Sequence, residues 1–556
     1  MKKHFSFFSR FLSKRNKHTT HALAFLNISQ FLSVLNDNMF KLFLVFLLID
    51  KLGASHASTI LSLAGAVYVI PFLLFSYLAG ILADKWSKQR LLVFMKVGEI
   101  LIMATALFAF GWKREILSYV LLFLLATHSA LLGPPKYGII PELFAKEKVA
   151  KANSLITAST YLAVILGTFL ASFITDISNR NFVVAAAFCF LIAVSGWVTS
   201  RRIPYTEAQG SKKHISWLFV SEIMGTLRKN KGIKHLIMAL WGAAFFLFIG
   251  AFVQLNIIPF AIQDLHLSEL AGGYLFLAVA LGIAGGAFLS GKILKKQVDL
   301  SLSCLASFVL AILFFLLFLN SHSLSFTIVC LVLLGISGGV FIVPFDIFIQ
   351  LQSPQQERGQ VIAAGNFLSF SGVLLASLCL FLFNDVLKLS PAESFALMGA
   401  FTLIAFVFLF KNLSGQTLSY LSKKILFRIC PLSATHIEFI SPDKLLILNN
   451  ASWTDCFFLL GYFPYLHFII PVKKVLFRHR IIAFLCPFSF CDMENKKEYP
   501  EGTCLVLHKH LSQDVETTLS KDIETQNPKW KRVLHIGSDL VHVAINTKNK
   551  TLSCWK

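Results

Sequence analysis

The sequence predicts an all-α polytopic membrane protein, with twelve transmembrane helices in two halves of six and a small cytoplasmic tail of mixed α and β structure. Three observations support this prediction. Of the 556 residues, 56% are hydrophobic and 14% charged, which is more apolar surface than a water-soluble core can bury. Apolar runs long enough to cross a bilayer recur between residues 20 and 411. A polar, basic stretch divides these runs into two sets of six.

The apolar segments can be read in order, because a spanning helix needs about 20 mostly apolar residues. The N-terminal half, 21–200, contains segments near 22–49, 57–83, 91–111, 117–135, 152–175 and 181–199. The C-terminal half, 235–411, contains segments near 235–262, 269–293, 300–319, 323–349, 360–384 and 391–410. The basic start, 1–20, precedes a run too long for a signal-peptide core of roughly 7–15 residues. We therefore expect the first segment to be a retained helix.

The net charge of +22 fits membrane topology better than nucleic-acid binding. Lys and Arg concentrate in the start, in loop 201–234 and after residue 411, and such residues mark cytoplasmic segments. The sequence has no aromatic and basic stretch typical of a nucleic-acid site. Both termini and the tail, 412–556, are therefore expected in the cytoplasm. The ten Cys residues form no CxxC pair, so we expect no metal site and no cofactor.

The loop after the second segment reads Gly80-Ile-Leu-Ala-Asp84-Lys85-Trp-Ser-Lys88-Gln-Arg90. A glycine lets two helices pack closely, and Asp84 can cap or pair with a neighbouring helix end. The bases would stay on the cytoplasmic face. The alternative is a merely solvated run of charges.

This loop resembles the signature loop of the major facilitator superfamily, and the resemblance extends over most of residues 20–411. Ser87 stands where that family usually has Gly. The equivalent place in the second half, from Gly291 to Lys296, keeps the bases and lacks a clear Asp. The resemblance implies the major facilitator fold.

The first segment carries Asn36, Asp37 and Asn38. An acidic side chain near the middle of a bilayer costs about 2.5–3.5 kcal/mol on insertion scales, which calls for a reason. One interpretation is a polar cluster that faces a cavity and meets a substrate headgroup or an ion. The alternative is an Asp satisfied by hydrogen bonds to a neighbouring helix.

The fourth segment ends in Gly133-Pro134-Pro135-Lys136-Tyr-Gly-Ile-Ile-Pro-Glu142. The two prolines are expected to break the helix, which would place Lys136 and Glu142 near the cytoplasmic mouth. A plain helix-terminating loop is the alternative. Further polar residues within the segments could line a cavity or have only a structural role. They are Lys96, Glu99, His128, Gln254, Asn256 and Asp346. Lys96 and Glu99 can pair on one helix face.

Two of these motifs, Leu35-Asn-Asp-Asn38 and Gly133 to Glu142, resemble the bacterial lysophospholipid transporter family, as does the stretch from Ser353 to Asn366. The resemblance implies alternating-access movement of lysophospholipid, chiefly lysophosphatidylethanolamine, from the outer to the inner leaflet of a bacterial inner membrane. It implies the substrate-binding residues Asn36, Asp37, Asn38, Lys136, Glu142 and Asn366. It also implies the gating residues Gly80, Asp84, Lys85, Lys88, Arg90, Glu357 and Arg358.

The tail carries Asn450 and Asp455, and then Glu501-Gly502-Thr-Cys504. These blocks resemble the glycerolipid acyltransferase family, in which a His acts as general base. Asn450 stands in the place of that His and cannot remove a proton, and Cys504 replaces an Arg. We expect a degenerate, non-catalytic tail, with an acyltransferase or acyl-carrier system as a candidate cytoplasmic partner. A membrane-anchored acyltransferase and a carrier of another small solute stay open as alternatives.

Overall fold

The computed structural model describes residues 2–53, 56–112, 114–211, 213, 215–294, 299–422 and 424, and seven short strands beyond them. The side chains of residues 1–20, 57–59, 62, 269–271 and 385, and those of the strands, lie outside the description. By compactness the chain divides into one unit of residues 1–298 and 306–402, and a second of residues 299–305 and 403–556. Each unit is described by itself.

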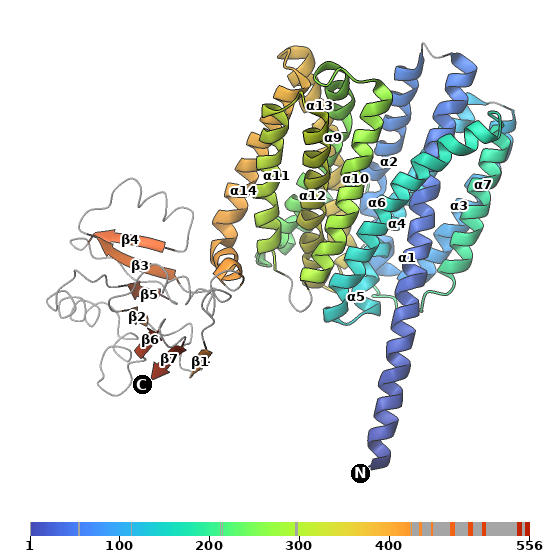
Figure 1. The fold of residues 1–556 in the computed structure, drawn as a ribbon. Helices are drawn as coiled ribbons and strands as arrows, with labels where there is room; N and C mark the ends of the chain where they lie inside the picture. The colour runs from blue at the N-terminus through green and yellow to red at the C-terminus, as the bar shows by residue number, and fades with distance from the viewer. Residues whose placement is uncertain are drawn as a thin grey trace. The chain divides into compact units, whose positions relative to one another are not determined.

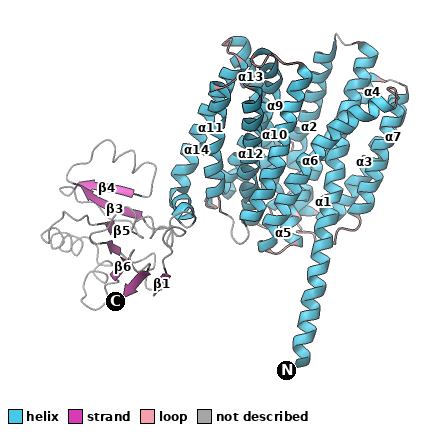
Figure 2. Cartoon of the chain, viewed as in Figure 1, coloured by secondary structure: helices cyan, strands magenta, loops and turns pink. Residues whose placement is uncertain are grey.

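The first unit is a bundle of long helices, drawn in Figures 1 and 2. Its N-terminal half contains α1 (Lys2–Leu52), α2 (Ala57–Lys85), α3 (Lys88–Gly111), α4 (Glu115–Gly138), α5 (Ile140–Leu143), α6 (Lys146–Ile177) and α7 (Phe182–Ser200). The linking segment contains α8 (Phe219–Lys229) and the short turn η2 (Asn230–Gly232). The C-terminal half contains α9 (Leu236–Gln263), α10 (Glu269–Ile293), α11 (Ser301–Leu319), α12 (Leu324–Gln352), α13 (Arg358–Phe381), η3 (Leu382–Val386) and α14 (Pro391–Leu421), the last of which continues into the second unit.

The expected spans are confirmed. Within the described residues, 12 helices are long and apolar enough to cross a membrane, and each lies on one of the segments read from the sequence. Helix α1 begins at Lys2, and Figure 1 shows its first part continuing past the ends of the other helices. The chain is therefore a multi-pass membrane protein.

Apolar packing holds each half together. In the N-terminal half, the rings of Phe40 on α1 and Phe110 on α3 stack with centroids 5.3 Å apart. In the C-terminal half, α10 and α12 touch backbone to backbone: a Cβ on Gly286 would lie 2.0 Å from the Ile336 carbonyl oxygen, and one on Gly335 would lie 2.2 Å from the Val279 oxygen. Small residues at this spacing allow the close approach that helices use in lipid.

The expectation that two prolines break the fourth helix is wrong. Helix α4 runs through Pro134 and Pro135 to Gly138, and α5 follows after one residue. A proline removes one helical hydrogen bond and crowds the preceding turn, but neighbouring helices can compensate for this in a membrane. Pro134 and Pro135 each lack an N–H donor, so α4 loses two helical hydrogen bonds and still continues to Gly138. Lys136 consequently lies on a helix and is buried.

Beyond residue 424, the described residues of the second unit form seven strands. A parallel sheet has the order β2-β5-β3-β4, and a three-stranded sheet has the order β1-β7-β6. Their bounds are β1 (Ser433–Thr435), β2 (Leu446–Leu448), β3 (His467–Val472), β4 (Phe488–Asp492), β5 (Thr503–Val506), β6 (His542–Asn546) and β7 (Thr551–Trp555). The tail residues Asn450, Asp455, Glu501 and Gly502 lie outside the described residues.

Candidate functional site

The two halves are joined at one end of the bundle by the carboxylate of Asp84. We call this end the base; it carries the loop between α2 and α3, the linking segment 201–234 and the loop before α13. Asp84, at the end of α2, accepts hydrogen bonds from the backbone N–H groups of Gly359 (2.6 Å) and Gln360 (3.0 Å), and from the Gln360 side chain (3.3 Å). A carboxylate thus caps the N-terminus of α13, where the helix dipole favours negative charge. This bond crosses from one half to the other.

Two glycines make this close approach possible. A Cβ on Gly80 would lie 2.7 Å from the Cβ of Ala363, and a Cβ on Gly359 would lie 2.7 Å from both Asp84 Oδ1 and the Gly80 carbonyl oxygen. Any side chain at either position would push α2 away from α13. The glycine and acid spacing noted in the sequence therefore serves this contact.

The charged residues around this contact have different surroundings. Lys88 is fully buried and its Nζ lies 2.5 Å from Glu142 Oε1, whereas Lys85 and Arg90 are exposed. Lys229 in the linking segment pairs with Glu357. The hydroxyl of Ser87, in the place where Gly was expected, accepts the Arg90 N–H (3.4 Å) and caps α3. Arg358 is buried, and the negative charges of Glu142 and Asp84 favour its charged form.

A second set of contacts joins the halves at the start of α6. The side-chain amides of Asn153 on α6 and Gln350 on α12 exchange two hydrogen bonds, of 2.9 and 2.6 Å. A Cβ on Gly291, at the end of α10, would lie 1.9 Å from the Ser154 hydroxyl oxygen. At this second contact between the halves, a pair of amides and close helix packing stand where the first contact has the Asp84 carboxylate. Sequence reading missed Asn153, which lies between Lys151 and Ser154 among the polar residues at the start of α6.

Within the N-terminal half, a buried network surrounds Glu99 on α3. Its carboxylate pairs with Lys96 (2.7 Å) and accepts the Asn36 amide (2.9 Å), while the Lys96 ammonium also donates to Ser33. His128 Nε2 lies 3.8 Å from Glu99. Asn36 therefore bonds to α3 through its amide nitrogen, and its buried Oδ1 has no hydrogen-bond partner among the described residues. The expected pairing of Lys96 with Glu99 is confirmed.

Asp37, the next residue along α1, has its hydrogen-bond partner on α4. Its Oδ2 accepts the Ser129 hydroxyl on α4 (2.6 Å), and its buried Oδ1 has no hydrogen-bond partner in the described part of the chain. Neighbouring positions on a helix differ by about 100° in direction, which is why Asn36 and Asp37 have different partners. A buried carboxylate oxygen left without a donor is costly and can bind a donor from a ligand.

Lys136 links Asp37 to the other half electrostatically. The charges of Asp37 on α1 and of Asp346 on α12 both act on the Lys136 ammonium, which lies 4.7 Å from the centre of the Tyr137 ring. Lys136 is thus buried inside the bundle, two residues before α4 ends at Gly138, where a Cβ would lie 3.0 Å from the Lys88 side chain at the base. Its expected place near the cytoplasmic mouth stays a prediction. Asp346 is half-buried and also acts on Tyr161.

The other expected substrate residues are spread more widely. The Asn38 amide donates to the Val34 carbonyl oxygen on its own helix (2.8 Å). Glu142 lies at the base, where it pairs with Lys88. The Asn366 amide nitrogen on α13 would lie 2.6 Å from a Cβ on Gly133, so it packs directly over α4. The charges of Asp37 and Lys136 therefore act on each other, whereas Asn38, Glu142 and Asn366 each have contacts of their own.

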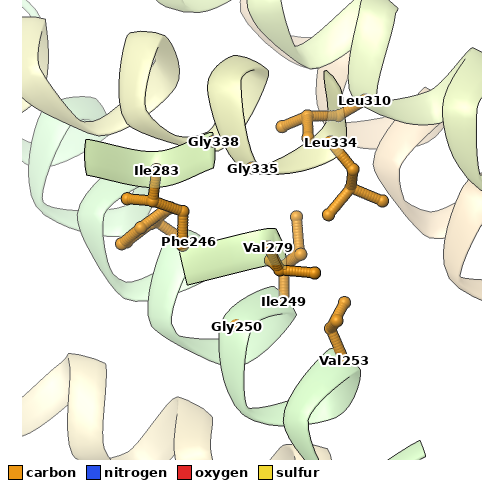
Figure 3. A pocket seen from close by; sticks show the side chains of 10 residues that line it. All are labelled: Phe246, Ile249, Gly250, Val253, Val279, Ile283, Leu310, Leu334, Gly335 and Gly338. Carbon is orange, nitrogen blue, oxygen red and sulfur yellow. The ribbon is translucent and has the colours of Figure 1, made fainter. Parts of the chain in front are cut away.

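The C-terminal half contains an apolar pocket between α9, α10, α11 and α12 (Figure 3). Its cavity volume is about 20 Å³, and Figure 3 shows aliphatic side chains and Phe246 around it. Its lining residues are Phe246, Ile249, Gly250, Val253, Val279, Ile283, Leu310, Leu334, Gly335 and Gly338. Every one of them is apolar. No group of His, Cys, Asp and Glu in the described residues could hold a metal ion.

Comparison with known proteins agrees with the helical arrangement. Residues 26–377 match the family model described as Major Facilitator Superfamily. The human organic anion transporter MFSD10 has a TM-score of 0.61 at 14% identity, covering 70% of this chain and 99% of that one. The Escherichia coli fucose:proton symporter FucP has a TM-score of 0.58 at 13% identity, covering 70% of this chain and 98% of that one. At such identities the likeness shows the fold alone.

Curated relatives in sequence include proteins named lysophospholipid transporter LplT. The one from Escherichia fergusonii is 26% identical over 360 residues, which is 63% of this chain and 85% of the relative. The one from Shigella sonnei is 27% identical over 353 residues, again 63% and 85%.

Proposed function

Because this chain belongs to the Major Facilitator Superfamily, we propose that it carries lysophospholipid across the membrane by alternating access between its two helical halves. The observation that carries the proposal is the pairing of two chemically opposite sites. Charged groups gather at Asp37, Lys136 and Asp346, and a wholly apolar pocket lies in the C-terminal half. The relatives named as lysophospholipid transporters support this substrate.

The charged site suits a zwitterionic headgroup such as that of lysophosphatidylethanolamine. The Lys136 ammonium can bind the phosphate, since charge-assisted hydrogen bonds are the stronger ones. The Oδ1 of Asp37, which has no partner among the described residues, can accept a hydrogen bond from the headgroup ammonium. Asp346 supplies a second negative charge. Asn36 and Asn38 support the α1 backbone around Asp37 through the bonds described above.

The apolar lining of the pocket suits part of the acyl chain, because apolar surface gains about 25 cal/mol per Å² when it leaves water. Gly250 lines the pocket and has open space where a Cβ would stand. A larger side chain there would fill the pocket without displacing backbone. In this proposal the two sites hold the two ends of one amphipathic molecule.

The test is uptake of labelled lysophosphatidylethanolamine into cells or vesicles that contain the full chain. Asp37→Asn should lower uptake about tenfold or more, which corresponds to one charge-assisted hydrogen bond. Asp50→Asn is the matched control, because Asp50 is on the same helix and pairs with Arg180 at 3.2 Å outside the central site. Equal uptake by the two variants would refute the headgroup assignment. Failure of the wild-type chain to take up the lipid at verified expression would refute the substrate.

The pocket is tested separately with Gly250→Leu. This variant should lower uptake of long-chain lysolipid more than that of a short-chain analogue, because only the long chain needs the pocket. Gly285→Leu is the control: its Cβ also meets open space, but it does not line the pocket. A loss that is independent of chain length would contradict the acyl-chain assignment.

For the tail, 412–556, we propose a cytoplasmic, degenerate acyltransferase-like domain of mixed α and β structure. Its support is the sequence motif around Asn450 and Glu501, in which the general base is missing. With both termini in the cytoplasm, an acyltransferase or acyl-carrier system there could receive the transported lipid. Uptake assays that follow conversion to diacyl lipid test this: conversion by the purified full chain, lost in Asp455→Ala, would show an active enzyme. Reporter fusions at each terminus test the orientation.

A further inference from the structure

The linking segment between the halves contains a short helix that packs against the contact between them. Helix α8 places Ile223 in a buried cluster with Tyr77 and Ile81 of α2 and Ala364 of α13, and Phe219 packs at the edge of the same cluster. The rings of Phe219 and Phe367 lie 6.4 Å apart, edge to face. One face of α8 therefore covers the seam between α2 and α13, on the side of the bundle.

The contacts of the linking segment show how far it extends from the base along α2 and α13. It leaves the base where the Ser211 N–H donates to the Asp84 carbonyl oxygen (3.3 Å), and it returns to the base where Lys229 pairs with Glu357. Between these points Phe219 reaches Phe367, nine residues into α13. At 1.5 Å per residue this is about 13 Å from the helix start. On α2, Lys213 lies over the ring of Tyr77, eight residues or about 12 Å from the helix end.

The segment thus rises along two membrane-spanning helices and descends again, and its highest part exposes apolar side chains. Trp217 is 98% exposed and Leu218 is 73% exposed, and Ile215 and Val220 are exposed on either side of them. Protein surfaces that face water seldom gather such groups without a partner. Trp is also the side chain that membrane proteins place at the boundary between lipid and water.

Basic side chains lie closer to the base than the exposed apolar residues 215–220. Arg228, Lys229, Lys231 and Lys234 are all exposed, at or after the end of α8. A segment that lies in the membrane interface has its apolar side chains in the lipid and its Lys and Arg side chains closer to water. The negative surface of a leaflet rich in anionic lipid complements those charges.

We propose that residues 215–220 insert into the lipid leaflet at the base of the bundle, and that anionic phospholipid headgroups bind the basic residues beneath them. This anchor holds α8 against the α2–α13 seam, where it stabilises the closed base. The lipid surface is thereby a binding partner of the linking segment, independently of the transported substrate.

The test uses the full chain in vesicles of brominated phosphatidylglycerol. The difference in emission between wild type and Trp217→Phe isolates Trp217, and the conservative replacement leaves the packing of α8 intact. We expect the brominated lipid to remove most of this component and aqueous acrylamide to leave most of it. Quenching by acrylamide alone would overturn the proposal, because Trp217 would then be in water. Shielding from both quenchers would also overturn it, because protein would then cover the segment.

The role of charge is tested by repeating the measurement in brominated phosphatidylcholine vesicles. We expect weaker quenching there, and in phosphatidylglycerol at high salt, because the attraction is screened. Identical quenching in all conditions would refute the anionic-lipid component. Trp217→Ser should also open the base in spin-label distance measurements on membranes, while Glu207→Ser, an exposed change in the same loop, should not. A base that stays closed in the Trp217 variant would refute the anchoring role.

Discussion

Replacing Asp84 with Asn should shift the bundle from base-closed to base-open. The carboxylate accepts two backbone hydrogen bonds from the start of α13, at 2.6 and 3.0 Å, and it is fully buried. Hydrogen bonds to a charged group contribute about 1.5–3 kcal/mol each, and neutral ones about 1. Asn keeps an acceptor oxygen and loses the charge. A loss of about 2 kcal/mol is therefore expected, which is roughly a 30-fold change in the ratio of closed to open states.

Spin labels at Lys146 and Lys292 would measure this shift by pulsed electron resonance. Both side chains are exposed at the base, one on each half, at the ends of helices that meet where Ser154 faces Gly291. The wild-type pair should give one short distance, and the Asp84→Asn pair should add a longer one. Lys85→Gln is the control, because this neighbouring charge is exposed. An unchanged distance distribution in the Asp84 variant would refute the reasoning that this cap holds the halves together.

Three further predictions concern other contacts. In a double-mutant cycle, Asn153→Ala and Gln350→Ala should each open the base in the same distance measurement. The double variant should add little, because the two amides bond to each other; additive effects would contradict this. Glu99→Gln should lower stability by about 3–5 kcal/mol, measured by thermal unfolding in detergent, because Lys96 is left as an uncompensated buried charge; Lys96→Met in the same chain should recover much of the loss. Gly80→Val should abolish the closed base and lower uptake strongly, since a Cβ there already lies 2.7 Å from Ala363; normal uptake would show that the α2–α13 approach is not needed.

The sequence was sufficient to predict the spans, because apolar runs of the right length leave the chain few alternatives in lipid. It also led to the expectation that Asp84 caps or pairs at a helix end, because an acid after a close-packing glycine has a recognisable spacing. The expected break in α4 was wrong because local proline chemistry was given more weight than the packing of neighbouring helices. The Asn153–Gln350 pair could not be found, because nothing in either local sequence states that α6 will meet α12.

The central residues show the same limit. Three consecutive polar residues on α1 were grouped as one site, yet helix geometry gives them three sets of partners. Asn36 bonds to Glu99, Asp37 to Ser129 and Asn38 to its own backbone. Only the side-chain direction decides which of them can meet a ligand, and that direction depends on how α1 is rotated against α3 and α4. Periodicity alone does not reveal this rotation, because α1 is largely apolar on several faces.

The charged centre and the base are energetically connected through the two halves. Lys136 on α4 is attracted by Asp37 within its own half and by Asp346 in the other half, so its charge helps to hold the halves together. A zwitterionic headgroup that brings its phosphate to Lys136 and its ammonium to the carboxylates replaces that attraction with contacts of its own. The cost of separating the halves then falls in the loaded carrier and stays high in the empty one. A substrate must bind the two conformations with different affinity in order to change the equilibrium between them. Lys136→Gln should therefore make base opening less dependent on lysolipid in the same spin-label measurement.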